Sequence, residues 1–164
     1  MNLNLSELPL EVHAVAKRVR EAGGKPYLVG GAVIDLLQGR EAKGWDLEVF
    51  GLDYGQLEVL FSDLNPKLVG AAFGIIKLNV NDVDIDVNVP RTDNKVGKGH
   101  KGFAVDMDPN MTVREAARRR DFTINTMAVD LVDGHVEDPF GGVADLNEGI
   151  LRATDPALFV QDPL

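Results

Sequence analysis

Two segments that alternate apolar and polar residues around a two-residue turn constrain the fold more than any other feature. The alternation runs through residues 75–80 and 83–89, and Asn81-Asp82 lies between them. A period of two places the apolar side chains on one face of an extended strand. Asn and Asp suit the tight turns that join paired strands. The pattern therefore predicts a β-hairpin.

The rest of the chain mixes short helices with short strands. Helices are predicted at 6–22, where Ser6 is the expected cap, and at 32–37, 57–61 and 112–119. Extended segments are predicted at 27–29, 47–50 and 150–152, and in a second hairpin of 128–132 with 135–136. The glycine-rich segment 91–102 is expected to be a mobile loop. Helices mixed with hairpins predict an α+β or α/β fold with a mixed sheet.

Composition restricts the class of protein further. The 164 residues are 45% hydrophobic, which is enough for an ordinary core. Cysteine is absent, so disulfide scaffolds, thiolate zinc sites and cysteine nucleophiles are excluded. The sequence has neither a run of about 18 apolar residues nor a signal-peptide pattern at its start. We therefore expect a soluble cytoplasmic protein that does not bind membranes.

Charge is distributed unevenly along the chain. The net charge of −9 disfavours general binding to the phosphates of nucleic acids. Residues 91–120 nevertheless hold eight Lys or Arg and four Asp or Glu, a net charge of +4. This segment is either an anion-binding face on an acidic body or a solvated loop followed by a surface helix.

Gly30-Gly31 lies between the predicted strand 27–29 and the predicted helix 32–37. Two glycines allow the backbone to approach a ligand closely, and the helix start offers unpaired N–H groups to an anion. The unit is therefore a candidate phosphate cradle, with a plain tight turn as the alternative.

Two pairs of carboxylates are candidates for metal binding. Asp46 and Glu48 are two residues apart, as are Asp84 and Asp86, so each pair projects from one face of its strand. If Asp46 and Asp86 faced each other across neighbouring strands, they would suit Mg²⁺, which one or two carboxylates hold together with substrate phosphates. The alternative is a pair of strands with Asp on their solvated face.

A third candidate is the run Arg118-Arg119-Arg120, which is followed directly by Asp121 and, four residues later, by Asn125. Arginine suits bidentate contacts to phosphate, and the Asp and Asn could orient the arginines or a sugar hydroxyl. A basic helix end is also favourable because of the helix dipole alone.

The order of these segments resembles the head domain of class II tRNA nucleotidyltransferases (CCA-adding enzymes), a pattern that bacterial poly(A) polymerases share. The matching segments are Leu28 to Val33, Asp46, Asp86 to Arg91, Arg119 to Asn125, and Asp138 to Gly142 with Asp145-Leu146. The resemblance implies a polymerase-β-like nucleotidyltransferase fold. It also implies an enzyme that transfers CMP or AMP from CTP or ATP to the 3′-hydroxyl of tRNA, with Mg²⁺ as cofactor.

The resemblance also implies roles for individual residues. Gly30 and Gly31 match the glycines that hold the triphosphate, and Asp46 and Asp86 match the catalytic, metal-binding carboxylates. The nucleotide-binding corner corresponds to Arg120, Asp121 and Asn125, and the segment 91–102 corresponds to the flexible catalytic loop.

The sequence departs from the family pattern at two positions. Ile34 stands where the family has Arg, and Gly44 stands where it has the first Asp of Asp-x-Asp. Glu48 is the remaining candidate for a replacement metal ligand, although it lies on the other side of Asp46 from position 44. We therefore expect impaired activity.

The resemblance predicts three parts: an N-terminal helix at 1–25, the head domain at 26–153, and the start of a truncated helical neck at 154–164. The domains that hold tRNA would follow in the family, and the apolar residues 157–160 could support self-association. A poly(A) polymerase head domain is one alternative. A non-catalytic nucleotide-binding or assembly module is an alternative from a different class.

Overall fold

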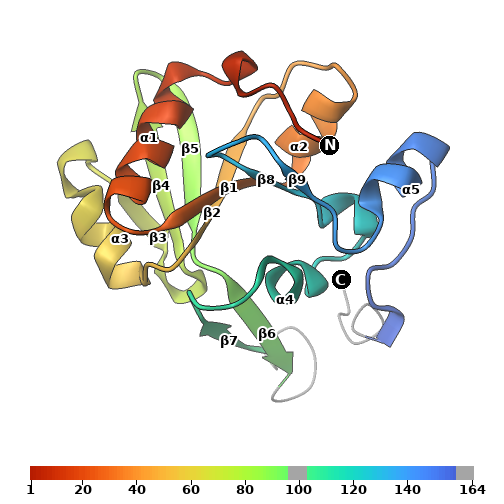
Figure 1. Cartoon of the computed structure of the whole chain (residues 1–164). Helices are drawn as coiled ribbons and strands as arrows, with labels where there is room; N and C mark the ends of the chain where they lie inside the picture. The colour runs from red at the N-terminus through yellow and green to blue at the C-terminus, as the bar shows by residue number, and fades with distance from the viewer. Residues whose placement is uncertain (96–102, 158–164) are drawn as a thin grey trace.

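The computed structural model describes residues 1–95 and 103–157, which form a mixed seven-stranded sheet with helices around it (Figure 1). The strand order is β3-β4-β5-β2-β1-β8-β9. The strands are β1 Lys25–Val29, β2 Trp45–Phe50, β3 Lys67–Gly70, β4 Ile75–Val80, β5 Val83–Asn88, β8 Ala128–Asp130 and β9 Val136–Glu137. Neighbours β2 and β5 are parallel, and the other described pairs are antiparallel. The expected α+β architecture with a mixed sheet is confirmed.

Five α-helices are described: α1 Leu10–Glu21, α2 Gly31–Leu37, α3 Tyr54–Leu60, α4 Val113–Arg118 and α5 Gly142–Glu148. Short 3₁₀ turns lie at Leu5–Glu7, Ser62–Leu64, Ala71–Phe73 and Thr123–Asn125. A second small sheet pairs β6 Arg91–Lys95 with β7 Phe103–Met107. Figure 1 shows this hairpin and α4 below the large sheet, away from α1 and α2.

The predicted hairpin is confirmed in full. Strands β4 and β5 pair with Val80 opposite Val83, and the turn residues Asn81 and Asp82 have φ values of 50° and 67°. Two consecutive left-handed residues give the turn a twist that matches paired strands. On this hairpin, the side chains of Asp84 and Asp86 lie on the same face of the sheet, and the buried Ile85 lies on the other face.

The two faces of the sheet have different environments. On one face, Leu28, Leu47 and Val49 are buried together with side chains of α1, α2 and α3, and this is the main core. On the other face, Tyr27, Val29 and Phe50 form a smaller cluster with Met111 and with Ala116 of α4. The polar side chains of β2 and β5 project from this second face, so α4 stands beside them.

The first predicted helix begins later than expected. It starts at Leu10 rather than Ser6, after the separate turn Leu5–Glu7, which the side chain of Asn4 caps by accepting from the Ser6 amide. Leu8 is extended, with ψ of 146°, because a residue before proline is driven out of the helical region. The proline therefore sets the boundary, and Ser6 is not the cap of α1.

The prediction of a loop at 91–102 is wrong for its first five residues, because these form strand β6. It pairs with β7, the next strand along the chain, and the polar composition of residues 91–95 does not reveal this pairing. The remaining residues of that loop, 96–102, lie outside the described residues, as do residues 158–160 of the apolar end. Strand β3 and helix α5 were not predicted, and residues 150–152 do not form a strand.

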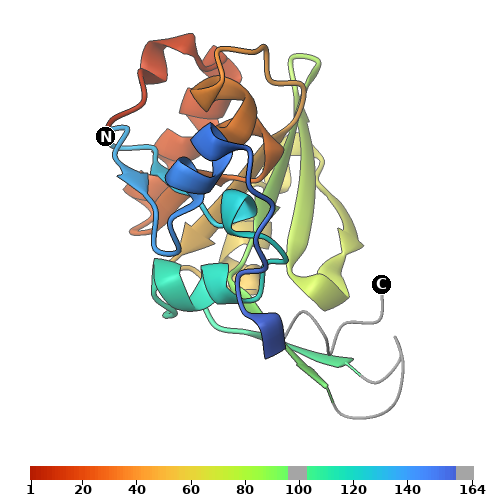
Figure 2. The ribbon, with the colours of Figure 1, turned by 90° about the vertical axis from the view of Figure 1, so that its right-hand side faces the viewer.

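The ends of the described chain lie against the body. Leu3 donates its amide to the Gly134 carbonyl and Asn2 bridges His135, so the N-terminal segment lies beside the β8–β9 turn. Figure 2 shows α5 on the side that faces the viewer, followed by the blue segment that ends the described chain. Within residues 1–95 and 103–157, no helix has both the length and the apolar composition needed to cross a membrane.

Candidate nucleotide and metal site

Asp46 and Asp86 meet at the centre of the large sheet. They are register partners on the parallel strands β2 and β5, so their side chains leave the same face side by side. Val29 of β1 lies opposite Asp46 on one side, and Lys77 of β4 lies opposite Asp86 on the other. The sequence-based hypothesis that these two carboxylates face each other across neighbouring strands therefore agrees with the register.

The electrostatic environment links these side chains to Arg120. Burial raises the pKa of the Asp46 carboxyl, and the charge of Asp86 raises this pKa further. The charges of Arg120 and Lys77 act in the opposite direction. Lys77 also forms an ion pair with Asp86, at 3.1 Å between Nζ and Oδ2. The two carboxylates therefore repel each other, and the positive charges of Arg120 and Lys77 offset this repulsion only in part.

The backbone of Gly30 borders the Asp46 carboxylate. Gly30 has φ of 79° and ψ of −155°, a conformation that is nearly restricted to glycine. A Cβ atom at this position would lie 3.0 Å from Asp46 Oδ2. Gly31 begins helix α2, is exposed, and has no atom within 4 Å of a Cβ position. Gly30 therefore borders the carboxylate directly, and Gly31 leaves open space at the start of α2.

The arginine run follows α4 and divides in two directions. The Thr112 hydroxyl caps α4 by accepting from the Glu115 amide at 3.1 Å. Arg118 turns outward and donates from Nε and Nη2 to Asp155 Oδ2, at 3.1 and 3.0 Å. Arg119 and Arg120 turn toward β2 instead. Three consecutive arginines thus supply one surface ion pair and two guanidinium groups near the site.

Glu48 receives these two guanidinium groups. Its Oε2 atom lies 3.6 Å from Arg119 Nη2 and 3.7 Å from Arg120 Nη2. Only 3% of Glu48 is exposed, although it is an acidic residue. Its assignment as a metal ligand stays a prediction from the sequence, and the two arginines that surround its carboxylate favour a different role.

Asp121 and Asn125, predicted to complete the nucleotide corner, are bonded to each other. Asn125 donates from Nδ2 to Asp121 Oδ1 at 2.8 Å, and the Phe122 amide donates to the same oxygen at 2.8 Å. The Asp121 carbonyl accepts from the Thr154 amide. These bonds fix the backbone just after Arg120, and Asp121 itself remains exposed.

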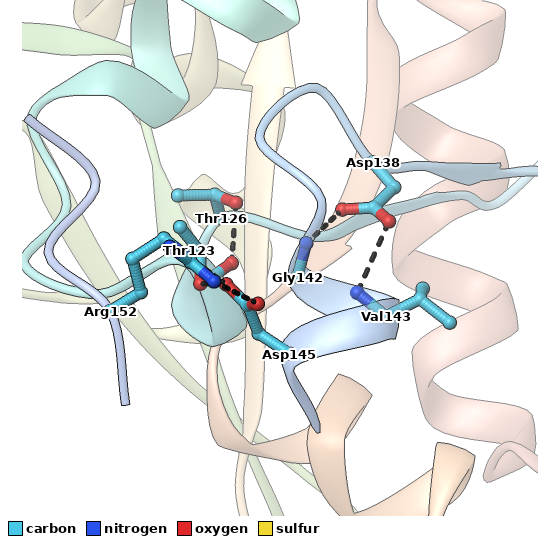
Figure 3. A network of polar contacts seen from close by, with 7 residues as sticks. All are labelled: Thr123, Thr126, Asp138, Gly142, Val143, Asp145 and Arg152. Atoms are coloured by element: carbon cyan, nitrogen blue, oxygen red, sulfur yellow. Dashed lines mark hydrogen bonds and ion pairs between the residues drawn. The ribbon is translucent and has the colours of Figure 1, made fainter. Parts of the chain in front are cut away.

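Asp145 is a buried carboxylate that holds the segment containing Asp121 and Asn125 in place. No role was predicted for it from the residues alone. Asp145 of α5 accepts from Thr123 Oγ1 at 2.6 Å and from Arg152 Nε at 3.0 Å (Figure 3). These donors lower the pKa of the Asp145 carboxyl, the Arg152 bond most strongly. The Thr126 hydroxyl donates to the Thr123 carbonyl. Asp145 was visible in the sequence only as part of the family resemblance.

Asp138 fixes the start of the same helix. Its two carboxylate oxygens accept from the amides of Gly142 and Val143, at 2.6 and 3.1 Å (Figure 3). A Cβ atom on Gly142 would collide with the Thr123 carbonyl oxygen, so glycine is required for this close contact. The segment Asp138 to Gly142 therefore has a structural role behind the site.

A polar cavity adjoins the Asp86 side of the site. Its volume is about 530 Å³, and its lining includes Lys67, Lys77, Asn79, Asp84 and Asp86. The cavity gives a ligand access to the Asp86 carboxylate from the β3–β4–β5 side. Asp84 accepts from Asn79 Nδ2 within this wall at 2.8 Å.

The donor set suits a hard cation that is shared with a ligand. Within residues 1–95 and 103–157, no three His, Asp or Glu side chains converge to hold a metal ion. Two adjacent carboxylates are nevertheless what Mg²⁺ uses when substrate phosphates and water complete its coordination. The raised pKa of Asp46 agrees with this, because a cation between Asp46 and Asp86 would relieve their repulsion.

The two positions that depart from the family pattern differ in their surroundings. Gly44 is exposed, and no atom lies within 4 Å of a Cβ placed on it. Ile34 is half-buried and packs against the main core. An aspartate at 44 would therefore have space.

Comparison with known proteins adds the family to this geometry. A family model described as the "Poly A polymerase head domain" matches residues 26–152. The chain belongs to this family. The match contains Gly30, Asp46, Asp86 and Arg120, and it continues through the anchor at Asp145.

Two similar relatives are named as CCA proteins. The "Multifunctional CCA protein" of Xanthomonas campestris is 44% identical over 85% of this chain, and the one of Stenotrophomonas maltophilia strain K279a is 42% identical over the same share. The chain covers 32% and 33% of these two relatives. It therefore spans about a third of their length.

Solved structures show the same fold. The Bacillus stearothermophilus CCA-adding enzyme in complex with CTP has a TM-score of 0.77 and 27% identity, and the match covers 93% of this chain and 35% of that one. The Thermotoga maritima CCA-adding enzyme complexed with tRNA has a TM-score of 0.72 and 31% identity, with 97% and 37% covered. The expected nucleotidyltransferase fold is confirmed.

Proposed function

We propose that the chain is the head domain of a tRNA nucleotidyltransferase that uses CTP and ATP. The observation that carries this proposal is the pairing of Asp46 with Asp86 beside the backbone of Gly30. In the proposed reaction, the RNA 3′-hydroxyl loses its proton to solvent and its oxygen attacks the α-phosphorus. The bond from that phosphorus to the oxygen bridging to the β-phosphate breaks, and pyrophosphate leaves with that electron pair.

The residues of the chain divide this work between them. The backbone of Gly30 and Gly31 would contact the triphosphate, and the Arg120 guanidinium would bind its phosphates. The hydrogen bond from Asn125 to Asp121 stabilises the backbone that follows Arg120. Asp46 and Asp86 would hold Mg²⁺ together with the phosphates. When bound, Mg²⁺ would neutralise charge that develops on the phosphates and activate the attacking oxygen.

Two observations favour low activity in this chain. Position 44 lacks a carboxylate, so one ligand expected from the family resemblance is missing, and Asp86 is ion-paired with Lys77.

CCA addition is favoured over poly(A) synthesis because the relatives named above are CCA proteins. Binding of the tRNA 3′ end would depend mainly on parts of such proteins that this chain does not span, and a cytoplasmic location is part of the same proposal.

The decisive experiment is nucleotide addition to tRNA that lacks its 3′ end. The chain and its Ile34→Arg/Gly44→Asp variant are incubated with labelled CTP or ATP and Mg²⁺. Each is also tested after fusion to the remaining two thirds of the Xanthomonas campestris relative. We expect label on the tRNA 3′ end, most strongly in the repaired fusion. A folded repaired fusion that adds no nucleotide contradicts the proposed activity.

The absence of a carboxylate at position 44 also supports a second candidate, a nucleotide-binding module without catalysis. That module would bind CTP or ATP through Gly30, Gly31 and Arg120 with little dependence on Mg²⁺. Calorimetry with and without Mg²⁺ separates the two functions, because affinity that rises steeply with Mg²⁺ supports the enzyme and counts against the module.

A further inference from the structure

Glu48 occupies an unusual position for a carboxylate. It lies two residues after Asp46 on β2, so both side chains project from the same face of the sheet. Glu48 is 3% exposed, and its register neighbours are Tyr27 on β1 and Asn88 on β5. A carboxylate buried this deeply requires compensating charge, since an isolated charge in a protein interior is strongly unfavourable.

The compensation comes from two guanidinium groups rather than one. Arg119 and Arg120 approach the same oxygen, Oε2, at 3.6 and 3.7 Å, and their side chains are 19% and 20% exposed. One negative charge between two positive charges leaves the group with a net charge of +1. Without Glu48, the two guanidinium groups would repel each other across a partly buried space.

The carboxylate also fixes where the positive charge lies. Because Glu48 and Asp46 share a short stretch of β2, an arginine held by Glu48 stays at a set distance from the Asp46–Asp86 pair. The arginines themselves come from the segment after α4, which is joined to the sheet at this point by these ion pairs. A net positive charge beside two carboxylates and an open glycine backbone suits the phosphates of a nucleoside triphosphate.

We infer that Glu48 is a positioning residue that holds Arg119 and Arg120 beside the proposed nucleotide site at Asp46, Asp86 and Gly30, and that it does not ligate metal. The inference rests on the proposed function, and it names the group that orients the phosphate-binding arginines. Glu48 acts through the arginines, so its removal disturbs nucleotide binding even when no divalent cation is present.

The first measurement tests the positioning without any nucleotide. The Nε–Hε signals of Arg119 and Arg120 are followed by ¹⁵N NMR relaxation in the unaltered chain, in Glu48→Gln and in Glu48→Asp. We expect ordered side chains in the unaltered chain, mobile ones in Glu48→Gln, and partial recovery of order in Glu48→Asp. Arginine signals that keep their order in folded Glu48→Gln overturn the inference.

The second measurement is calorimetric titration with CTP, with and without Mg²⁺. We expect Glu48→Gln to weaken CTP binding on the order of tenfold under both conditions, because the arginines are displaced. In an Arg120→Gln background, Glu48→Gln should add little further loss. Glu58→Gln removes the same charge from exposed Glu58 of α3, which packs on the opposite face of the sheet, and serves as the matched control.

The possible results separate the alternatives. If Glu48→Gln removes only the Mg²⁺-dependent part of CTP binding, Glu48 is a metal ligand and the inference is wrong. If Glu48→Gln lowers thermal stability while the folded variant binds CTP normally, its role is purely structural, and the inference is again wrong. If the unaltered chain does not bind CTP at all, the proposed function fails, whereas the NMR result still decides whether Glu48 orders the arginines.

Discussion

Asp46 and Asp86 lie side by side on parallel strands, and each is close to a cation that belongs to a different part of the fold. Asp86 is paired with Lys77 of the neighbouring strand, while Asp46 lies within the electrostatic reach of Arg120. The sheet thus holds two like charges together in the folded state, which is unfavourable unless a ligand or cation joins them.

This relationship predicts the pH dependence of Asp46→Asn. Burial and the charge of Asp86 raise the pKa of Asp46 above its unfolded value of about 3.9. A raised carboxyl pKa contributes stability that is fully present below the unfolded value and is lost as pH rises through the folded value. The neutral variant should therefore gain thermal stability over the unaltered chain near pH 7 and lose this advantage near pH 3. Circular dichroism melts across this range test it, and a difference in Tm that is independent of pH contradicts it.

The backbone at Gly30 gives a prediction with an internal control. Gly30→Ala should destabilise the fold by about 1–3 kcal/mol, because φ is 79° and the new methyl group would press on Asp46 Oδ2. Gly31→Ala places the same methyl group one residue later, where the backbone is helical and the space is open, so its effect should stay within about 1 kcal/mol. Urea unfolding of both variants measures the difference. Equal losses would show that the Gly30 conformation is not the cause.

The anchor behind the arginines predicts a response to acid. Arg152 and Thr123 lower the pKa of Asp145, so its stabilising effect is present above the unfolded value of about 3.9 and is lost as pH falls through the folded value. Asp145→Asn should lower Tm at neutral pH and make the melting curve less sensitive to acid.

Thr123→Val provides the companion test of this anchor, because it removes one donor and leaves Asp145 paired with Arg152. We expect a smaller loss of Tm, and the losses of the two variants should not add in the double variant, since both act on one network. Full additivity would place Thr123 outside the Asp145 network.

The sequence was most informative where side-chain pattern and local geometry agree. The period-two alternation predicted the hairpin at Asn81-Asp82, and helical periodicity predicted a helix within residues 6–22, where α1 lies. The opposition of Asp46 and Asp86 could be stated only as a condition, because the register of parallel strands depends on contacts between distant segments.

Other features depend on long-range packing that no local pattern carries. The burial of Glu48 between two arginines arises from where α4 docks on the sheet. The i, i+2 spacing of Asp46 and Glu48 predicted a shared face but not that α4 delivers Arg119 and Arg120 to one of the two carboxylates. The apolar residues Leu47, Val49 and Phe50 around Glu48 were the available sequence signal that this part of the strand is buried.

Gly44→Asp restores the charge expected from the family resemblance. Position 44 directly precedes β2 and lies two residues before Asp46, and its surroundings leave room for a side chain. Without Mg²⁺, a third carboxylate near Asp46 and Asp86 should destabilise the fold by about 0.2–1 kcal/mol through repulsion. With Mg²⁺ and CTP, the same carboxylate should strengthen binding by about tenfold, because more ligand charge offsets dehydration of the ion.

Gly44→Asn is the matched control, since it has the same shape without the charge. Its CTP affinity should follow that of the unaltered chain with and without Mg²⁺, whereas Gly44→Asp should differ only when Mg²⁺ is present. Calorimetry and thermal melts of the three proteins measure both effects. If Asn and Asp at this position have the same effect, position 44 does not contribute charge to a metal site, and the family's two-carboxylate arrangement on this strand does not apply to this chain.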